Sequence, residues 1–150
     1  IWNNENYYLV AFDGESGQMR HYRVDKMAEI LQTNQPRQGG REYPGFDLAA
    51  YAQKHFGMYS GQEMTVTLRG HSSMAGVIWD RFGQDVILVP DGPEHFTVSV
   101  PLVLSPQFFG WLFGLETGVT VVAPPQAVEA YRQKLAQVAA LYPLPTSPDP

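Results

Sequence analysis

The chain has 150 residues, of which 44% are hydrophobic and 17% charged, and its formal net charge is -5 at pH 7. These values predict one ordinary domain or two small ones with a real core, and they exclude an intrinsically disordered protein. The sequence has no cysteine and no apolar run of the roughly 20 residues needed to cross a bilayer, so we expect a cytoplasmic protein without disulfides, thiolate chemistry or a membrane partner.

A β-hairpin is predicted across residues 7–31. The apolar run "YYLVAF" (Tyr7 to Phe12) leads into the turn sequence "DGESG", and "MRHYRVDKMAEIL" follows as a second extended run. No strand is visible before residue 7, and an isolated hairpin is not stable in water. We therefore expect the sheet to be completed by strands that lie upstream of this chain.

A loop and a short helix are predicted next. The segment "QTNQPRQGGREYPG" (residues 32–45) is polar and rich in glycine and proline, which favours a loop or linker. The helix is expected to begin at Phe46 with Asp47 near its start and to end at the glycines 57 and 61. One face of this helix carries Leu48, Tyr51, Ala52 and His55 or Phe56.

From residue 63 the pattern predicts the order β-α-β-β-α-β-α. The first strand covers residues 64–70, and a helix capped by Ser72 or Ser73 runs to about Phe82. The strands "DVILVP" and "HFTVSVPLV" are joined by the turn "DGPE". Ser105 and Pro106 begin a helix that extends to about residue 116, "VTVVA" is a further strand, and the last helix covers residues 126–142. The proline-rich tail, residues 143–150, is expected to be disordered.

This order is typical of a ferredoxin-like sandwich with an added terminal helix. The predicted fold class is therefore α+β, with a small β-rich part in front of the ferredoxin-like part.

The chain offers no convincing catalytic or metal site. Around Ser72 and Ser73, "RGHSSMAG" lacks the small residues on both sides that a nucleophile elbow needs, so a helix cap is favoured over a hydrolase. The four histidines are scattered without a metal-ligand spacing, and no glycine-rich phosphate loop occurs. We expect no enzyme, no metal and no cofactor.

Positive charge is concentrated in the front of the chain. Residues 1–41 hold five basic and five acidic side chains, whereas the rest holds five basic and ten acidic ones. In a strand, alternate residues share a face. His21, Arg23 and Asp25 then lie on one side, and Arg20, Tyr22, Val24 and Lys26 on the other, with Tyr22 and Val24 facing the core.

Two interpretations of this basic strand remain open. In the first, Arg20, His21 and Arg23 form a basic and aromatic surface beside Tyr8, which binds phosphates by charge-assisted hydrogen bonds and bases by stacking. In the second, the strand is a solvated face on which Asp25 and Glu29 neutralise the arginines.

The sequence resembles the WYL-domain family of bacterial transcription regulators. The family's Trp-Tyr-Leu run corresponds to Tyr7-Tyr8-Leu9, and its following signature corresponds to "RHYRVDKM" (residues 20–27). The remainder is similar to the family's C-terminal extension, known as WCX. The matching residues there are Trp111, Leu112, Gly118, Val119, Val121 and Pro124, followed by a long helix that ends in "ALY".

The resemblance implies a division of the chain into four parts. Residues 1–34 would be the C-terminal strands of a small Sm-like or SH3-like WYL barrel whose first strands are missing. Residues 35–62 would be a linker, residues 63–142 the WCX domain and residues 143–150 a tail.

The resemblance also implies a function. The chain would sense a nucleotide or single-stranded nucleic acid, form a homodimer, and act on DNA through an upstream module that this chain lacks. The family's ligand-binding residues carry over to Tyr8, Arg20 and Arg23, with His21 as a neighbour. The alternatives are a structural oligomerisation module without a ligand and an accessory protein of an RNA-guided nuclease system.

Overall fold

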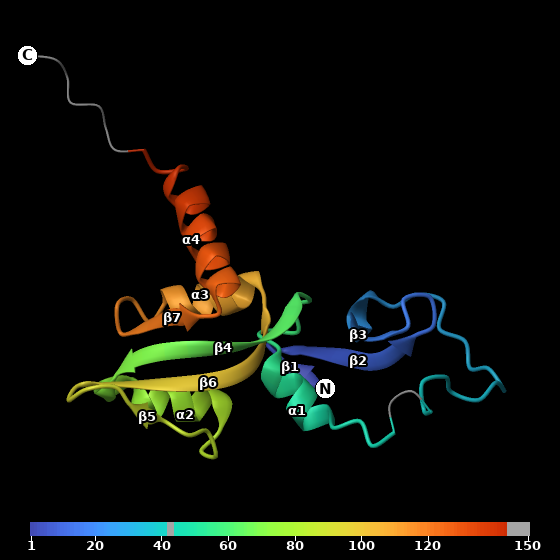
Figure 1. The fold of residues 1–150 in the computed structure, drawn as a ribbon. Coiled ribbons are helices and arrows are strands. Elements are labelled where there is room, and N and C mark those ends of the chain that lie inside the picture. Colours follow the sequence, from blue (N-terminus) through green and yellow to red (C-terminus); the bar gives the residue numbers. More distant parts are fainter. Residues whose placement is uncertain (42–43, 144–150) are drawn as a thin grey trace, which may run out of the picture. The chain divides into compact units, whose positions relative to one another are not determined.

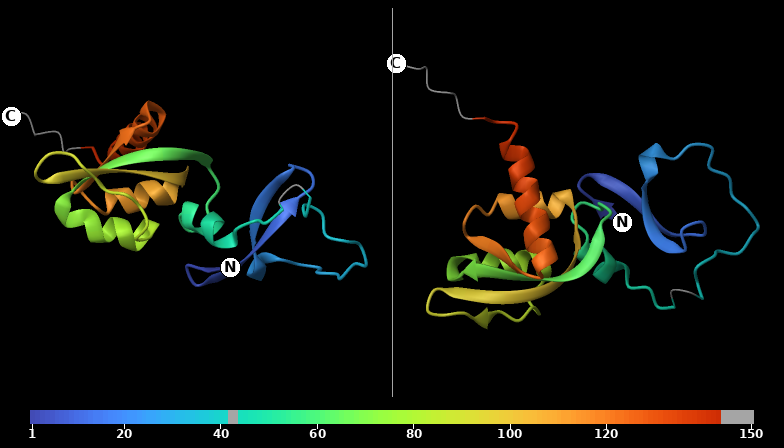
Figure 2. Two further views of the ribbon diagram at one scale, coloured as in Figure 1. Left: turned by 60° about the horizontal axis from the view of Figure 1, so that its bottom comes forward. Right: turned by 45° about the horizontal axis from the view of Figure 1, so that its top comes forward.

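A computed structural model describes residues 1–41 and 44–143 of the chain (Figures 1 and 2). The chain divides into two compact units, Ile1–Tyr59 and Ser60–Pro150. Each unit holds one antiparallel sheet together with helices, which confirms the predicted α+β class. The finer four-part division of the chain stays a prediction.

The first unit is built on a three-stranded sheet with the order β1-β2-β3. β2 (Asn6–Asp13) and β3 (Gln18–Arg23) form the predicted hairpin, and β1 (Trp2–Asn3) pairs with the start of β2. The expectation of no strand before residue 7 was therefore wrong, because a two-residue strand is too short to show a periodic pattern. In the described part of the chain this sheet is open and does not close into a barrel.

The basic strand is shorter than predicted. β3 ends at Arg23, and the chain then turns into the 3-10 helix η1 (Val24–Lys26), which is closed by a hydrogen bond from the Met27 amide to the Val24 carbonyl. Tyr22 and Val24 were expected to face the core but are 40% and 43% exposed. Alternation correctly separates the two faces of a strand, but it does not reveal which face another element covers.

Helix α1 (Leu48–Lys54) is shorter than predicted, because it begins two residues after Phe46 and ends three residues before Gly57. Asp47 is its N-cap, and the carboxylate accepts hydrogen bonds from the amides of Ala49 and Ala50 at 2.9 and 3.0 Å. Tyr51 is half-buried, and His55, just past the helix, is buried. Leu48, which the spacing places on the same face, is 46% exposed, so the predicted apolar face is covered only toward its C-terminal end.

The second unit follows the predicted order of elements (Figure 1). Its four strands are β4 (Gln62–His71), β5 (Val89–Pro90), β6 (His95–Leu104) and β7 (Val119–Ala123), arranged β5-β6-β4-β7 with antiparallel neighbours. Its α-helices are α2 (Ala75–Phe82), α3 (Pro106–Phe113) and α4 (Pro125–Ala139).

Alternating valines and leucines of the two central strands form the core of the second unit. Val66 and Leu68 of β4 pair with Val100 and Val98 of β6, and all four are buried. Helices α2 and α3 each add two buried side chains. These are Ile78, Phe82, Phe108 and Leu112.

Three local predictions in the second unit need correction. β5 has only two residues, because its segment pairs with β6 only at Val89 and Pro90. The cap of η2 (Ser72–Met74), the 3-10 turn before α2, is His71 and neither of the serines, since the His71 ring accepts from the Ser73 amide. α3 and α4 each end about three residues earlier than predicted, α3 at Phe113, where Gly114 forms its C-cap, and α4 at Ala139. The predicted disordered tail lies outside the described residues, apart from residue 143.

Replacing Ile78 by alanine is expected to lower the free energy of unfolding by about 2–5 kcal/mol, because Ile78 is fully buried and leaves a cavity. The neighbouring Trp79 is 40% exposed, so Trp79→Ala is expected to cost less although it removes a larger side chain. Urea denaturation of both variants checks this. A larger loss for Trp79→Ala would contradict the packing of α2.

Candidate ligand-binding face of the first unit

The register of the hairpin determines which predicted site residues share a face. Tyr8 lies opposite Arg23, and Val10 lies opposite His21. Because alternate residues of a strand share a face, Tyr8, His21 and Arg23 lie on one side of the sheet, which we call the Arg23 face. Arg20 lies opposite Ala11 and projects from the other side. The structure therefore brings together three of the four predicted residues and separates Arg20 from them.

Arg23 combines accessibility with a strong local partner. Its side chain is 37% exposed, and it donates two hydrogen bonds to the Asp25 carboxylate, from Nε at 3.0 Å and from an Nη at 2.8 Å. These hydrogen bonds hold the pKa of Asp25 below its usual value. The neutralisation of this arginine by Asp25, one of the two interpretations of the basic strand, is thus present in the structure.

Arg20 has a separate acidic partner. Its Nε lies 3.1 Å from a carboxylate oxygen of Asp13, at the end of β2. Asp13 also accepts a hydrogen bond from the Ser16 hydroxyl, and this bond, with a smaller contribution from the charge of Arg20, lowers the pKa of Asp13. Arg20 and Asp13 therefore form an ion pair beside the hairpin turn, away from the Arg23 face.

His21 is held by the helix that follows the long loop. Its Nδ1 lies 3.0 Å from the hydroxyl of Tyr51, and its ring packs edge-on against the ring of His55 with centroids 5.3 Å apart. His55 in turn donates from Nδ1 to the Tyr51 carbonyl at 2.7 Å. Tyr51 and His55 were assigned to a helix face but to no site, because nothing in the sequence links them to a strand thirty residues away.

Burial and charge both favour the neutral form of His21. Partial burial lowers the pKa of His21, and the nearby charge of His55 acts in the same direction, while a backbone hydrogen bond with Met58 acts against them. Burial also raises the pKa of Tyr51, so its hydroxyl keeps its proton at neutral pH. Neutral His21 can then accept a hydrogen bond from Tyr51, which ties α1 to β3.

The Arg23 face carries the kinds of side chain that bind anions and aromatic rings in other proteins. Arg23 offers a guanidinium group, and Tyr8 and His21 offer ring surfaces with their centroids 6.3 Å apart. Within residues 1–41 and 44–143 there is no group of three or more histidine or acidic side chains placed to hold a metal ion. None of the helices in those residues is long and apolar enough to span a bilayer.

Acidification is expected to loosen α1. The pKa of His21 is lowered while α1 is docked, that is, while Tyr51 contacts His21. When α1 is undocked, His21 has its ordinary pKa and therefore takes up a proton first as the pH falls below about 6.5. The free energy by which neutral His21 favours docking of α1 is therefore fully present above that pH. It is lost as the pH falls toward the lowered pKa and does not change further below the lowered pKa. Amide hydrogen exchange of residues 48–54 between pH 7.5 and 5 measures this as a falling protection factor.

His21→Gln should remove most of this pH dependence. His71→Gln changes an exposed histidine of the second unit and serves as the control, which should behave as the unmodified protein does. If protection of α1 falls equally in all three proteins, His21 is not the group responsible.

Comparison with known proteins gives a family for the second unit. The WCX domain matches residues 62–139. A comparison with curated proteins found no match. Among solved structures the chain is similar to proteasome accessory factor B/C (PafBC) of Arthrobacter aurescens, with 19% sequence identity and a TM-score of 0.43. That match covers 97% of this chain and 22% of that protein, so the chain spans about a fifth of its length.

The WCX match covers slightly more than half of the chain, from the start of β4 to the end of α4. It confirms the resemblance inferred from the Trp111-Leu112 motif and the glycine, valine and proline residues that follow. The chain belongs to the WCX domain family.

Proposed function

We propose that this chain is the ligand-sensing and dimerisation region of a WYL-type transcription regulator, and that it binds a nucleotide or single-stranded nucleic acid on the Arg23 face. DNA would be contacted by a module outside this chain. The cross-strand pair of Tyr8 and Arg23, with His21 beside it, is the observation that carries the proposal. The strand order of the second unit supports a ferredoxin-like WCX domain, which we also propose.

The chemistry of the face favours a phosphate-bearing ligand. A guanidinium group binds a phosphate through two parallel hydrogen bonds, and an aromatic side chain stacks on a nucleobase. Arg23 and Tyr8 supply one of each from directly opposed positions. Residues 1–41, which contain the hairpin, hold five basic and five acidic side chains, so this part of the chain carries no net charge that repels an anion.

Asp25 acts as an internal competitor for the ligand. A phosphate that binds Arg23 in the bidentate manner must displace the Asp25 carboxylate from the same nitrogen atoms. Both side chains are partly exposed, so solvent can receive the displaced carboxylate. We infer that the pair keeps Arg23 oriented in the free protein and lowers its affinity for weak anions.

Arg23→Ala is expected to weaken binding of a short single-stranded oligonucleotide about tenfold or more, because it removes a charge-assisted hydrogen bond. The slope of log affinity against log salt should become shallower by about 0.7, because one phosphate of the ligand is no longer neutralised. Fluorescence anisotropy at two salt concentrations measures both. Arg20→Ala is the matched control from the same strand, and we expect a smaller loss because Arg20 projects from the opposite face.

An unchanged affinity of Arg23→Ala would disprove the ligand face. Equal losses for the two variants would instead mean that the ligand covers both faces of the hairpin. Asp25→Asn offers a further check, since freeing Arg23 from its carboxylate partner should raise the affinity.

A second part of the proposal concerns dimerisation through the last two helices. An apolar groove of about 510 Å³ lies between α3 and α4. Phe113 and Val138 line it and are exposed. The rings of Phe109 and Tyr131 also line it, with their centroids 5.4 Å apart. The C-terminal half of α4 extends beyond the sheet in Figures 1 and 2, and its apolar residues continue to the exposed Leu141 and Tyr142.

A second copy of this chain fits this surface better than a charged partner does. The groove is lined almost entirely by apolar side chains, and such a surface gains free energy when it is removed from water. In a two-fold dimer the same surface of both copies forms the interface, so the apolar residues of α4 on one copy would pack against those of the other. The groove and the exposed Leu141 and Tyr142 that follow it support the predicted homodimer.

Sedimentation equilibrium should give twice the 16.8 kDa mass of one chain. Val138→Glu places a charge in the groove and is expected to produce monomers. Gln137→Glu adds the same charge at the neighbouring exposed position, outside the groove lining, and should leave the dimer intact. A monomer at all concentrations for the unmodified protein would refute this part of the proposal.

A further inference from the structure

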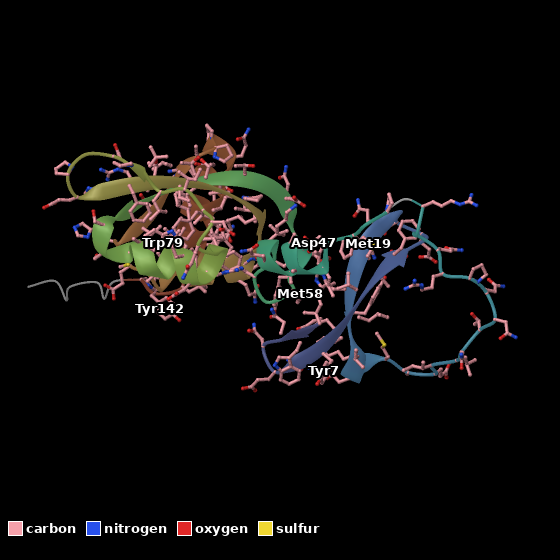
Figure 3. The ribbon with its side chains drawn as sticks, turned by 90° about the horizontal axis from the view of Figure 1, so that it is seen from below. Tyr7, Met19, Asp47, Met58, Trp79 and Tyr142 are labelled. Atoms are coloured by element: carbon pink, nitrogen blue, oxygen red, sulfur yellow. The ribbon has the colours of Figure 1, made fainter. Side chains whose placement is uncertain are left out.

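The loop between η1 and α1 packs onto the hairpin. Residues 27–47 form this connection without an α-helix or a strand among the described residues, and loops of this length in compact proteins are usually either functional or linkers. In Figure 3 the chain leaves the hairpin in a wide arc and returns near the hairpin end that carries Met19. The returning segment lies beside the end of the Arg23 face that carries Phe12 and Met19.

Two contacts fix the returning segment. Gly39 has a φ of +86°, and a Cβ at this position would overlap the side chain of Phe12, so only glycine fits here without strain. A Cβ on Gly14, in the hairpin turn, would come within 2.8 Å of the Gln38 side chain. The loop backbone therefore lies directly against β2 and the turn that follows it.

A cavity lies between this loop and the sheet. It measures about 500 Å³, within the range of small-molecule sites. Phe12 and Met19 from the hairpin and Phe46 from the end of the loop give it apolar walls, and Arg37 and Gln38 give it a polar side. The cavity thus combines a site for a planar ring with a guanidinium group for an anion.

The cavity continues the Arg23 face. Phe12 lies opposite Met19, and both share the face of Tyr8 and Arg23 because the pairs are four residues apart along the strands. Four residues at about 3.3 Å correspond to about 13 Å. Between the two pairs lies His21, whose partner Tyr51 packs against the ring of Phe46 with centroids 5.3 Å apart.

We propose that this cavity is a second ligand subsite, in which a nucleobase packs against Phe12 and Phe46 and Arg37 contacts an adjacent phosphate. This inference rests on the proposed function and specifies the length of the ligand. A stacked single strand rises about 3.4 Å per nucleotide, so about 13 Å corresponds to about four steps, or about five nucleotides. The preferred ligand is then a short single strand, and a mononucleotide fills only one end of the face.

The test compares two arginines of one loop. Arg37 lines the cavity, whereas Arg41, which is also exposed, lies outside the lining. A fluorescent pentathymidylate is titrated with the full chain and with Arg37→Ala, Arg41→Ala and Arg23→Ala. Arg37→Ala should bind about tenfold more weakly with a salt slope shallower by about 0.7, and Arg41→Ala should bind within about twofold of the unmodified chain.

Ligand length gives a second readout. The unmodified chain should bind the pentanucleotide at least about tenfold more tightly than thymidine monophosphate, and Arg37→Ala should reduce this ratio. Gly39→Val, which forces the loop away from Phe12, should reduce it as well, with circular dichroism to verify the fold.

The outcomes separate the subsite from the proposed function. If Arg23→Ala weakens binding while Arg37→Ala does not, the subsite is wrong and the ligand face stands. If neither substitution changes the affinity, both proposals fail. Equal losses for Arg37→Ala and Arg41→Ala would show a general effect of charge and would also overturn the subsite.

Discussion

The antiparallel register between β2 and β3 is the constraint on which the first unit depends. It sets Tyr8 opposite Arg23 and Val10 opposite His21, and it sends Arg20 to the other side of the sheet. A slip of one residue would exchange the two faces, because the side-chain period of a strand is two. The turn from Asp13 to Gly17 fixes this register, with the Gly17 amide bonded to the Asp13 carbonyl and Gly17 at a φ of +67°.

The same register distributes the positive charge of an acidic protein. Each arginine of β3 has its own carboxylate, Asp13 for Arg20 and Asp25 for Arg23. Surface ion pairs of this kind contribute little to stability. They do hold long side chains in defined positions, so the guanidinium groups of the strand have a fixed orientation.

Sequence patterns predicted the second unit well because its signals are local. Ser105 caps α3 with Pro106 in its first turn, and "VTVVA" forms β7 at the expected residues. The α+β class and the family motifs followed from such segments. β5 was predicted too long, because hydrophobic character alone does not say how far a segment pairs with its neighbour.

The candidate site was less predictable because its contacts are not local. Alternation along β3 correctly grouped His21 with Arg23, yet it could not show that Tyr51 and His55 return to that strand from α1. Nor could it show that the Tyr22 side of the sheet is exposed. Gly39 had only a loop signal in the sequence, and its contact with Phe12 depends on the path of the whole connection.

Helix α1 has seven residues, fewer than the roughly 12–15 that an isolated helix needs in water, so its helical state depends on its docking through Tyr51 and His55. A residue rises about 1.5 Å in a helix and about 3.3 Å in an extended chain. Undocking of α1 would therefore lengthen the connection from the hairpin to β4 by roughly 13 Å. The contact between Tyr51 and His21 thus limits the length of the chain segment between the hairpin and β4.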